Sequence, residues 1–280
     1  MQEVELGQGP GRKGRKETKV LPKGEKHSPM VIAHRGFSGA VPENTLAAFR
    51  RAIEIGSDGI ELDIQLSRDA KVMVRHDETL KKTTDGRGRL ADYTLEELKK
   101  LDAGSWFDPQ FSGERIPTLK EVLDLAEGRV LVNIEIKQPH HGPYPITELA
   151  DRALKIVKKA GMIQEVVFSS FNPVSLEWIK KKDPRVPVAL LFHGKWNSLP
   201  QVTQGEKYSQ LNLRRTYLTR TKIARIHREG MKVHVYTVNS ARELERFVKW
   251  GADGIITNYP DRLLSLLGEK KSGWDQGKTS

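Results

Sequence analysis

The chain has 280 residues, 37% hydrophobic and 30% charged, with a formal net charge of +11. This length suits one large globular core, and a single α/β barrel would use most of it. The absence of cysteine excludes a disulfide framework, a thiolate metal site and a cysteine nucleophile. The positive charge favours anionic partners such as phosphate esters, nucleic acid or anionic lipid, without choosing among them.

The two ends of the chain lack the apolar periodicity of a folded core. Residues 1–29 are rich in Gly, Lys and Arg, and we expect a disordered basic tail there, with a flexible C-terminal tail over residues 269–280. The N-terminal segment has no apolar core of a secretory signal, and no apolar run is long enough to span a membrane, so we expect a cytoplasmic protein. Met30 directly precedes the first predicted strand and is a candidate natural start. A native peptide from upstream of Met30 would refute that hypothesis.

From Met30 onward, strand-like and helix-like segments alternate. Strands are predicted over residues 30–34, 59–66, 71–76, 130–137, 166–171, 186–192, 211–215, 232–238 and 254–258. Helices are predicted over 44–56, 118–128, 146–161, 172–183, 220–230, 241–251 and 260–268. Repeated strand–helix alternation predicts a parallel sheet. About eight such units favour a closed TIM (β/α)8 barrel over residues 30–268.

One segment interrupts this alternation. Residues 77–115 form a long excursion between a strand and the next helix, with a short helix-like stretch, TLEELKKL, flanked by turn clusters. We predict a small inserted segment after the second strand of the barrel. Long loops in barrels usually lie at the functional face.

Charged residues alternate with apolar ones along two predicted strands. In GIELDIQL, Glu61 and Asp63 share one face, and in VLVNIEIK, Glu135 and Lys137 share one face. In an exposed sheet this would only mark a solvated side, but a barrel strand is covered on both faces. Inward carboxylates are costly unless they are paired or bind a metal. The pattern therefore predicts a site for one divalent cation, Mg²⁺ or Ca²⁺ with Mn²⁺ also possible, on Glu61, Asp63 and Glu135. Lys137 would pair with a carboxylate or hold an anionic substrate.

Two predicted strands end in histidine. His34 ends MVIAH and His76 ends KVMVRH, at the strand ends where barrel enzymes carry their chemistry. Arg35 follows His34 and is suited to a bidentate contact with a phosphate. One imidazole would remove a proton from a nucleophile and the other would protonate a leaving oxygen. The cation and Arg35 would neutralise charge on the phosphoryl oxygens. This set predicts cleavage of a phosphodiester.

These motifs together resemble the signature of the glycerophosphodiester phosphodiesterase family. The matching stretches are HRG at 34–36, PENT at 42–45, ELD at 61–63, HD at 76–77 and EIK at 135–137. The resemblance extends over residues 30–267. A single tripeptide of this kind would be a weak signal, whereas the ordered set is highly specific.

The resemblance implies a TIM barrel that hydrolyses glycerophosphodiesters to glycerol 3-phosphate and an alcohol, with a divalent metal on the three carboxylates named above. It implies that His34 acts as base towards the glycerol hydroxyl, giving a cyclic phosphate, and that His76 is the acid that releases the alcohol. Which histidine has which role is left open. It also implies that Glu43 orients Arg35 or the metal ligands. Tyr236 stands where the family often has Trp, and would form a wall of the leaving-group pocket.

Other polar and aromatic residues near the strand ends have ordinary explanations. Asn44 and Thr45 are as suited to capping a helix as to contacting substrate, and Asn258 suits turn geometry. Loop or core roles are favoured over pocket roles for His140, His141, His193, Phe171 and Trp196.

Two alternatives remain for the function. A lysophospholipase D would use the same catalytic set, and an apolar groove on residues 77–115 would favour it, whereas a small polar pocket would favour glycerophosphocholine-like substrates. A non-catalytic anion-binding barrel would leave the inward carboxylates and both histidines unexplained. No nucleic-acid partner is expected, because the interleaved aromatic residues of a nucleic-acid groove are missing. The sequence does not indicate an oligomeric state.

Overall fold

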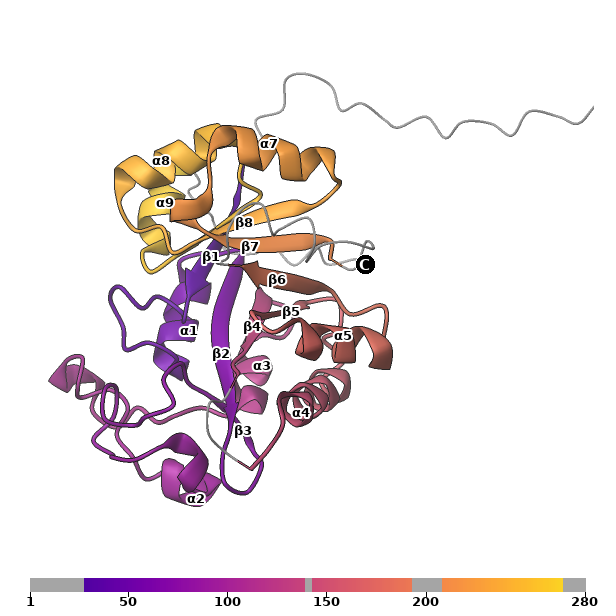
Figure 1. Ribbon diagram of the computed structural model, residues 1–280. Helices are drawn as coiled ribbons and strands as arrows, with labels where there is room; N and C mark the ends of the chain where they lie inside the picture. Colours follow the sequence, from indigo (N-terminus) through magenta and orange to yellow (C-terminus); the bar gives the residue numbers. More distant parts are fainter. Residues whose placement is uncertain (1–27, 139–142, 193–207, 269–280) are drawn as a thin grey trace, which may run out of the picture.

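The computed structural model describes residues 28–138, 143–192 and 208–268 (Figure 1). Apart from residues 28 and 29, both expected tails lie outside the described residues. So do His140, His141, His193 and Trp196.

Eight parallel strands close into a barrel (Figure 1). β1 pairs with both β2 and β9, which completes the ring. The barrel strands are β1 (Met30–His34), β2 (Gly59–Leu66), β4 (Leu131–Ile136), β5 (Val166–Ser170), β6 (Val188–Phe192), β7 (Gln210–Arg214), β8 (Lys232–Tyr236) and β9 (Gly254–Thr257). The predicted TIM barrel is therefore confirmed.

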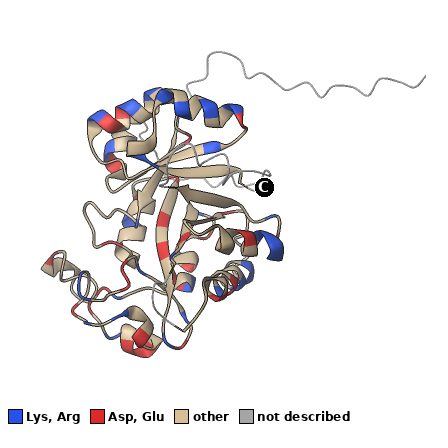
Figure 2. Cartoon of the chain, in the orientation of Figure 1, with Lys and Arg blue, Asp and Glu red and all other residues tan. Residues whose placement is uncertain are grey.

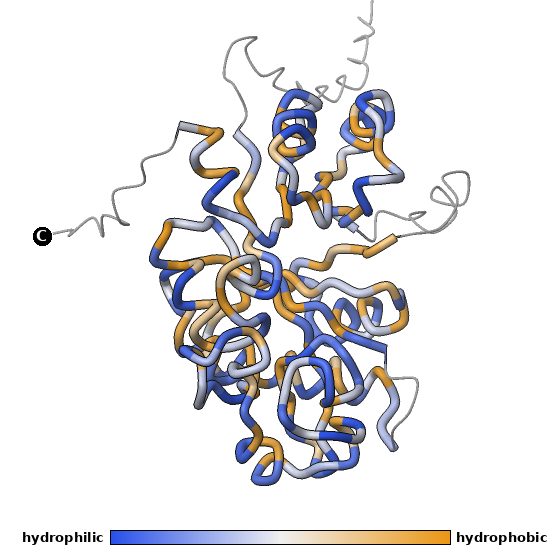
Figure 3. The backbone as a smooth tube through the Cα atoms, turned by 90° about the vertical axis from the view of Figure 1, so that its left-hand side faces the viewer, coloured by the Kyte–Doolittle hydropathy of each residue, from blue (hydrophilic) through white to orange (hydrophobic). Residues whose placement is uncertain are grey.

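Helices cover the outer face of the barrel (Figure 1). They are α1 (Leu46–Glu54), α3 (Leu119–Ala126), α4 (Ile146–Lys159), α5 (Pro173–Lys182), α7 (Arg220–Arg228), α8 (Ala241–Trp250) and α9 (Pro260–Leu267). Hydrophobic and hydrophilic positions alternate around them (Figure 3), so each has one face to bury.

The main core lies between these helices and the outward side chains of the strands. Ile60, Leu62 and Ile64 of β2 are 0% exposed and pack in one cluster with helix residues such as Phe49 and Leu123. Burial of each such side chain contributes about 1.5–3 kcal/mol. Because neighbouring residues of a strand point to opposite faces, this outward apolar set directs the acidic residues of β2 into the barrel.

The antiparallel strand β3 (Val72–Val74) is shorter than predicted. It pairs with β2 at Ile64–Leu66, whereas β1 occupies the same edge of β2 at Gly59–Glu61. The Arg75 backbone N–H still donates to the carbonyl of Asp63 at 2.8 Å, and the chain leaves the sheet after this bond. His76 therefore lies beyond the strand and not at its end, which corrects the expected strand over residues 71–76.

Residues 77–115 lie between β3 and α3, as the sequence predicted. They contain the short elements η1 (Leu90–Asp92), α2 (Leu95–Leu98) and η2 (Pro109–Phe111). Leu80, Leu90 and Leu98 pack in a separate small core with Met73 of β3. The segment thus has its own apolar support beside the barrel.

The charges are unevenly distributed over the fold. Lys and Arg positions are frequent on α7 and α8, whereas β2 in the middle of the sheet carries acidic positions (Figure 2). Among the described residues, basic positions thus gather on these outer helices, while the interior of the barrel carries acidic ones. Within the described ranges, none of the helices is both long and apolar enough to cross a membrane.

Candidate active site

Three carboxylates meet inside the carboxyl end of the barrel. One oxygen from each of Glu61, Asp63 and Glu135 lies within 4.8 Å of the others. The barrel register aligns them, because Asp63 is the pairing partner of Glu135 across β2 and β4. Burial and the neighbouring carboxylates raise the pKa values of Glu61 and Glu135 above their ordinary range. Buried, mutually repelling oxygen donors fit a divalent cation such as Mg²⁺ or Ca²⁺.

Two cationic side chains flank this acidic cluster. Lys137 Nζ lies 2.8 Å from Glu135 Oε1 and 3.6 Å from Asp63 Oδ1, and Arg35 Nε lies 3.4 Å from Asp63 Oδ2. Burial opposes ionisation of Asp63, but Arg35 and Lys137 lower its pKa to about 2. Asp63 is therefore ionised at neutral pH. Of the two roles expected for Lys137, the structure shows the pairing with a carboxylate.

The PENT turn supports Arg35 and Asp63 together. Glu43 Oε1 accepts a hydrogen bond of 2.9 Å from Arg35 Nη1, which is the orienting contact expected for Glu43. Asn44 has φ +55° and donates from Nδ2 to Asp63 Oδ2 at 3.0 Å. Thr45 accepts from the backbone N–H of Ala48 and is the helix cap. Of the two capping candidates, only Thr45 caps, while Asn44 contacts the cluster because Asn tolerates the left-handed backbone that aims it there.

His34 is held by an amide. Its Nδ1 lies 2.7 Å from Asn258 Oδ1, and its Nε2 lies 4.0 Å from Glu61 Oε2. Burial, reinforced by the Arg35 guanidinium, lowers the pKa of His34 to about 3. An amide oxygen only accepts hydrogen bonds, so Nδ1 carries the proton and Nε2 keeps its lone pair. Sequence analysis suggests only a turn role for Asn258, because no local pattern marks it as a partner of a residue 224 positions away.

His76 is held by a carboxylate. Its Nδ1 lies 2.7 Å from Asp77 Oδ1, and Lys82 Nζ lies 3.1 Å from Asp77 Oδ2. Burial opposes ionisation of Asp77, but hydrogen bonds from His76 and Lys82 lower its pKa. The Asp77 carboxylate thus fixes the orientation of the His76 ring through Nδ1. The HD motif contained this pair, but the sequence assigned a role only to the histidine.

Tyr236 closes the far side of the site. It ends β8 and packs edge-on against Phe171, with ring centroids 6.3 Å apart. Its hydroxyl is buried and has no hydrogen-bond partner among the described residues. Burial and the nearby Glu135 raise the pKa of this phenol, so it stays a donor. The structure thus presents an aromatic wall with a hydroxyl, which is what the sequence expected of Tyr236.

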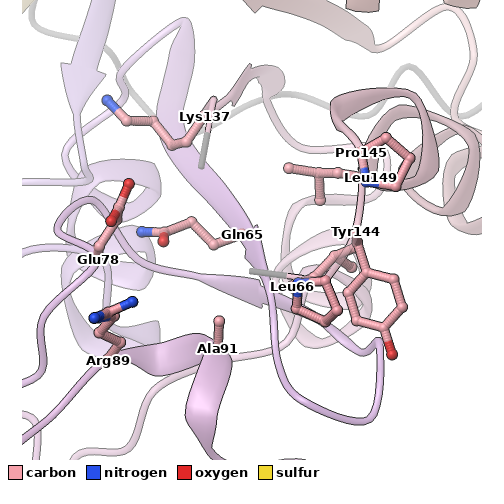
Figure 4. Close-up of a pocket in the computed structure, with 10 residues that line it drawn as sticks. Gln65, Leu66, Glu78, Arg89, Ala91, Lys137, Tyr144, Pro145 and Leu149 are labelled. Carbon is pink, nitrogen blue, oxygen red and sulfur yellow. The ribbon is translucent and has the colours of Figure 1, made fainter. Parts of the chain in front are cut away.

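A cavity lies beside the acidic cluster (Figure 4). Lys137 and Gln65 belong to its wall. One side is polar, with Glu78 and Arg89 from the 77–115 segment. The other side is more apolar and is formed by Leu66, Tyr144, Pro145 and Leu149. The cavity therefore offers space for one end of a substrate whose phosphate lies among the charged groups.

A barrel whose strand ends bring together an acidic cluster, two cations and two oriented imidazoles has the construction of a phosphodiesterase. The model of the glycerophosphoryl diester phosphodiesterase family matches residues 34–262. The chain belongs to this family, whose members are enzymes, and the resemblance found in the sequence is confirmed.

Individual relatives agree with this membership. The chain is 43% identical over 240 residues to a glycerophosphodiester phosphodiesterase of Caldanaerobacter subterraneus subsp. tengcongensis, covering 85% of this chain and 97% of that protein. It is 35% identical over 253 residues to one from Bacillus subtilis, covering 83% and 84%. The solved structure of an Oleispira antarctica phosphodiesterase in complex with the product sn-glycerol-3-phosphate has a TM-score of 0.79 and 29% identity, covering 86% of this chain and 97% of that one.

Proposed function

We propose that this protein hydrolyses glycerophosphodiesters to glycerol 3-phosphate and an alcohol, with a divalent cation held by Glu61, Asp63 and Glu135. The observation that carries the proposal is the pair of imidazoles beside the acidic cluster, one held by an amide and the other by a carboxylate. Such unlike partners favour opposite protonation states, as a base and an acid require.

His34 is proposed as the base. Its neutral Nε2 takes the proton from the glycerol hydroxyl next to the phosphate, while Asn258 keeps Nδ1 protonated. The freed oxygen bonds to phosphorus and forms a cyclic phosphate as the bond to the alcohol breaks.

His76 is proposed as the acid. Asp77 stabilises its protonated ring, and Nε2–H gives its proton to the departing alcohol oxygen. Water then opens the cyclic phosphate. His76, now neutral, accepts the proton of that water, and His34 returns its proton to the glycerol oxygen, so both rings end as they began.

Arg35 and Lys137 are proposed to bind the non-bridging phosphoryl oxygens. Both already lie against the carboxylates of the cluster, so a phosphate at the cluster would meet them without a large movement. A divalent cation bound there would add positive charge against the same oxygens. We propose Mg²⁺ or Ca²⁺ as the cation, with Mn²⁺ as a substitute, because all three donors are hard oxygens.

The test is release of glycerol 3-phosphate from glycerophosphocholine by metal-stripped protein, with Mg²⁺, Ca²⁺ or Mn²⁺ added singly. We expect release that depends on the added metal. Release at the full rate from stripped protein would contradict the metal role, and no release under any condition would contradict the substrate class.

A second candidate is lysophospholipase D activity. It is favoured by the apolar side of the cavity beside Lys137, formed by Leu66, Tyr144, Pro145 and Leu149. The residues contributed by the 77–115 segment are mostly polar, which weakens it. Comparing kcat/KM for lysophosphatidylcholine and glycerophosphocholine decides between the two, since the same catalytic set serves both.

A further inference from the structure

The short stretch that carries His76 is held from the barrel side by Gln65. This side chain is 6% exposed and lies on the inward face of β2, in the wall of the cavity (Figure 4). Its Nε2 donates to the carbonyl oxygens of Arg75 at 2.9 Å and of His76 at 3.0 Å. This amide thus ties the backbone of the stretch to the barrel where it leaves the sheet, next to the backbone hydrogen bond of 2.8 Å from Arg75 N–H to the Asp63 carbonyl.

The same stretch is held from the other side by Arg75. This guanidinium is 4% exposed, and its Nε donates to the carbonyl of Asp77 at 3.1 Å. Nη1 donates to Thr83 Oγ1, and Nη2 donates to the carbonyls of Thr79 and Leu80. A buried cation that directs its donors to loop carbonyls fixes that loop, because each unmade bond would leave a polar group unpaired.

His76 needs such support for its position. Its ring is anchored by Asp77, which is the next residue of the same stretch and would move with it. His34, by contrast, is in a strand paired on both sides, and its anchor Asn258 follows another strand. The location of the His76 imidazole therefore depends on what holds residues 75–80.

We propose that Gln65 and Arg75 are positioning residues for His76, which together fix its imidazole at the place where the leaving alcohol is protonated. The inference rests on the proposed function, in which His76 is the acid. It predicts that loss of either side chain harms the protonation step and spares metal binding and the base.

Two substrates separate protonation from the rest of the reaction. Glycerophosphocholine releases an alkoxide that needs a proton, whereas the p-nitrophenyl ester of glycerol 3-phosphate releases a stable anion that does not. We expect Gln65→Met and Arg75→Lys each to lower kcat for glycerophosphocholine by roughly 10- to 100-fold, with KM and the metal titration within about 2-fold. In a single turnover of the p-nitrophenyl ester, followed by release of p-nitrophenolate before water opens the cyclic phosphate, each should lose less than about 3-fold.

Gln210→Met is the matched control. Gln210 is also a buried glutamine of the barrel interior, and it donates to Asn212 and His234 on the strands β7 and β8. Its loss should lower the melting temperature as much as Gln65→Met does, without any difference between the two substrates.

The decisive comparison uses His76→Ala as background. If His76→Ala shows the substrate difference and Gln65→Met adds less than about 2-fold to it, the positioning role is supported. If Gln65→Met lowers both substrates equally or raises KM, Gln65 contacts substrate or only stabilises the fold, and the proposal is overturned. If His76→Ala itself shows no substrate difference, the acid role fails and this proposal fails with it.

Discussion

His34 ends a barrel strand that neighbours pair on both sides, whereas His76 stands on a loop that has already left the sheet. The first is placed by backbone hydrogen bonds of the ladder, and the second by the side chains of Gln65 and Arg75. The positions of the side chains in this one site are therefore fixed in two different ways. The proposed metal ligands and the proposed base share the rigidity of the barrel, while the proposed acid is placed by the side chains of Gln65 and Arg75.

Glu61→Gln tests the site residues that the barrel strands place, and we expect it to have the largest effect. The substitution keeps the shape and removes the charge, so metal binding should weaken and turnover should fall on the order of 1,000-fold. A metal titration followed by calorimetry checks the first effect and a glycerol 3-phosphate assay the second. An unchanged titration would refute the ligand assignment.

His234→Gln tests whether the barrel interior resists protonation. His234 is 5% exposed, accepts from Gln210 Nε2, and burial lowers its pKa from 6.5 to about 4. The unfolded chain therefore binds this proton more readily, so stability is full above pH 6.5 and is lost as pH falls towards 4. The shift corresponds to about 3 kcal/mol. Urea unfolding at pH 6.5 and at pH 4 should show a loss that is smaller in His234→Gln than in the native protein by about this amount, while the buried His34 contributes equally to both proteins.

Asn258→Asp sharpens the contrast between the two histidines by giving both a carboxylate partner. A carboxylate favours the protonated ring, so it raises the pKa of His34 and removes the neutral base at low pH. The acid limb of the pH profile of kcat/KM should move to higher pH by about 1–3 pH units. The conservative variant Asn258→Gln, with a neutral amide, should not move that limb. Identical profiles for the Asp variant and the native protein would contradict the base role.

Substitutions at helix caps should have the smallest effects. They allow the stability of the barrel to be compared directly with that of the 77–115 segment. Thr45 caps α1 on the barrel and Thr94 caps α2 in the 77–115 segment, and each accepts from a backbone N–H. Replacement by Ala should cost about 1 kcal/mol in either case. Hydrogen exchange should show global weakening in Thr45→Ala but weakening confined to residues 77–115 in Thr94→Ala. The same pattern in both would mean that the segment and barrel unfold together.

Much of the fold and part of the candidate site could be predicted from the sequence. Successive side chains of a strand point to opposite faces whatever surrounds the strand. The alternation along GIELDIQL and VLVNIEIK therefore predicted inward carboxylates. The structure brings Glu61, Asp63 and Glu135 together as that argument required.

The hydrogen-bond partners of the proposed catalytic groups could not be predicted from the sequence. Asn258 meets His34 only because the barrel closes, and a contact across 224 positions leaves no local pattern. Asn44 was taken for a possible cap, since its left-handed backbone cannot be read from residue type alone. The alternation along GIELDIQL puts Gln65 on the same face as Glu61 and Asp63, but it does not show that the amide donates to the loop, which follows from the end of β3 at Val74.

Turnover of glycerophosphocholine and of the p-nitrophenyl ester of glycerol 3-phosphate by His34→Ala and His76→Ala tests the division of labour between the two histidines most directly. We predict that His34→Ala loses activity on both substrates, since each needs the base. In a single turnover, His76→Ala should slow alcohol release from glycerophosphocholine and keep most of the rate of p-nitrophenolate release from the ester, because that release precedes the opening of the cyclic phosphate. Equal losses on both substrates in His76→Ala, or selective rescue of His34→Ala by the p-nitrophenyl ester, would contradict the assignment of base and acid.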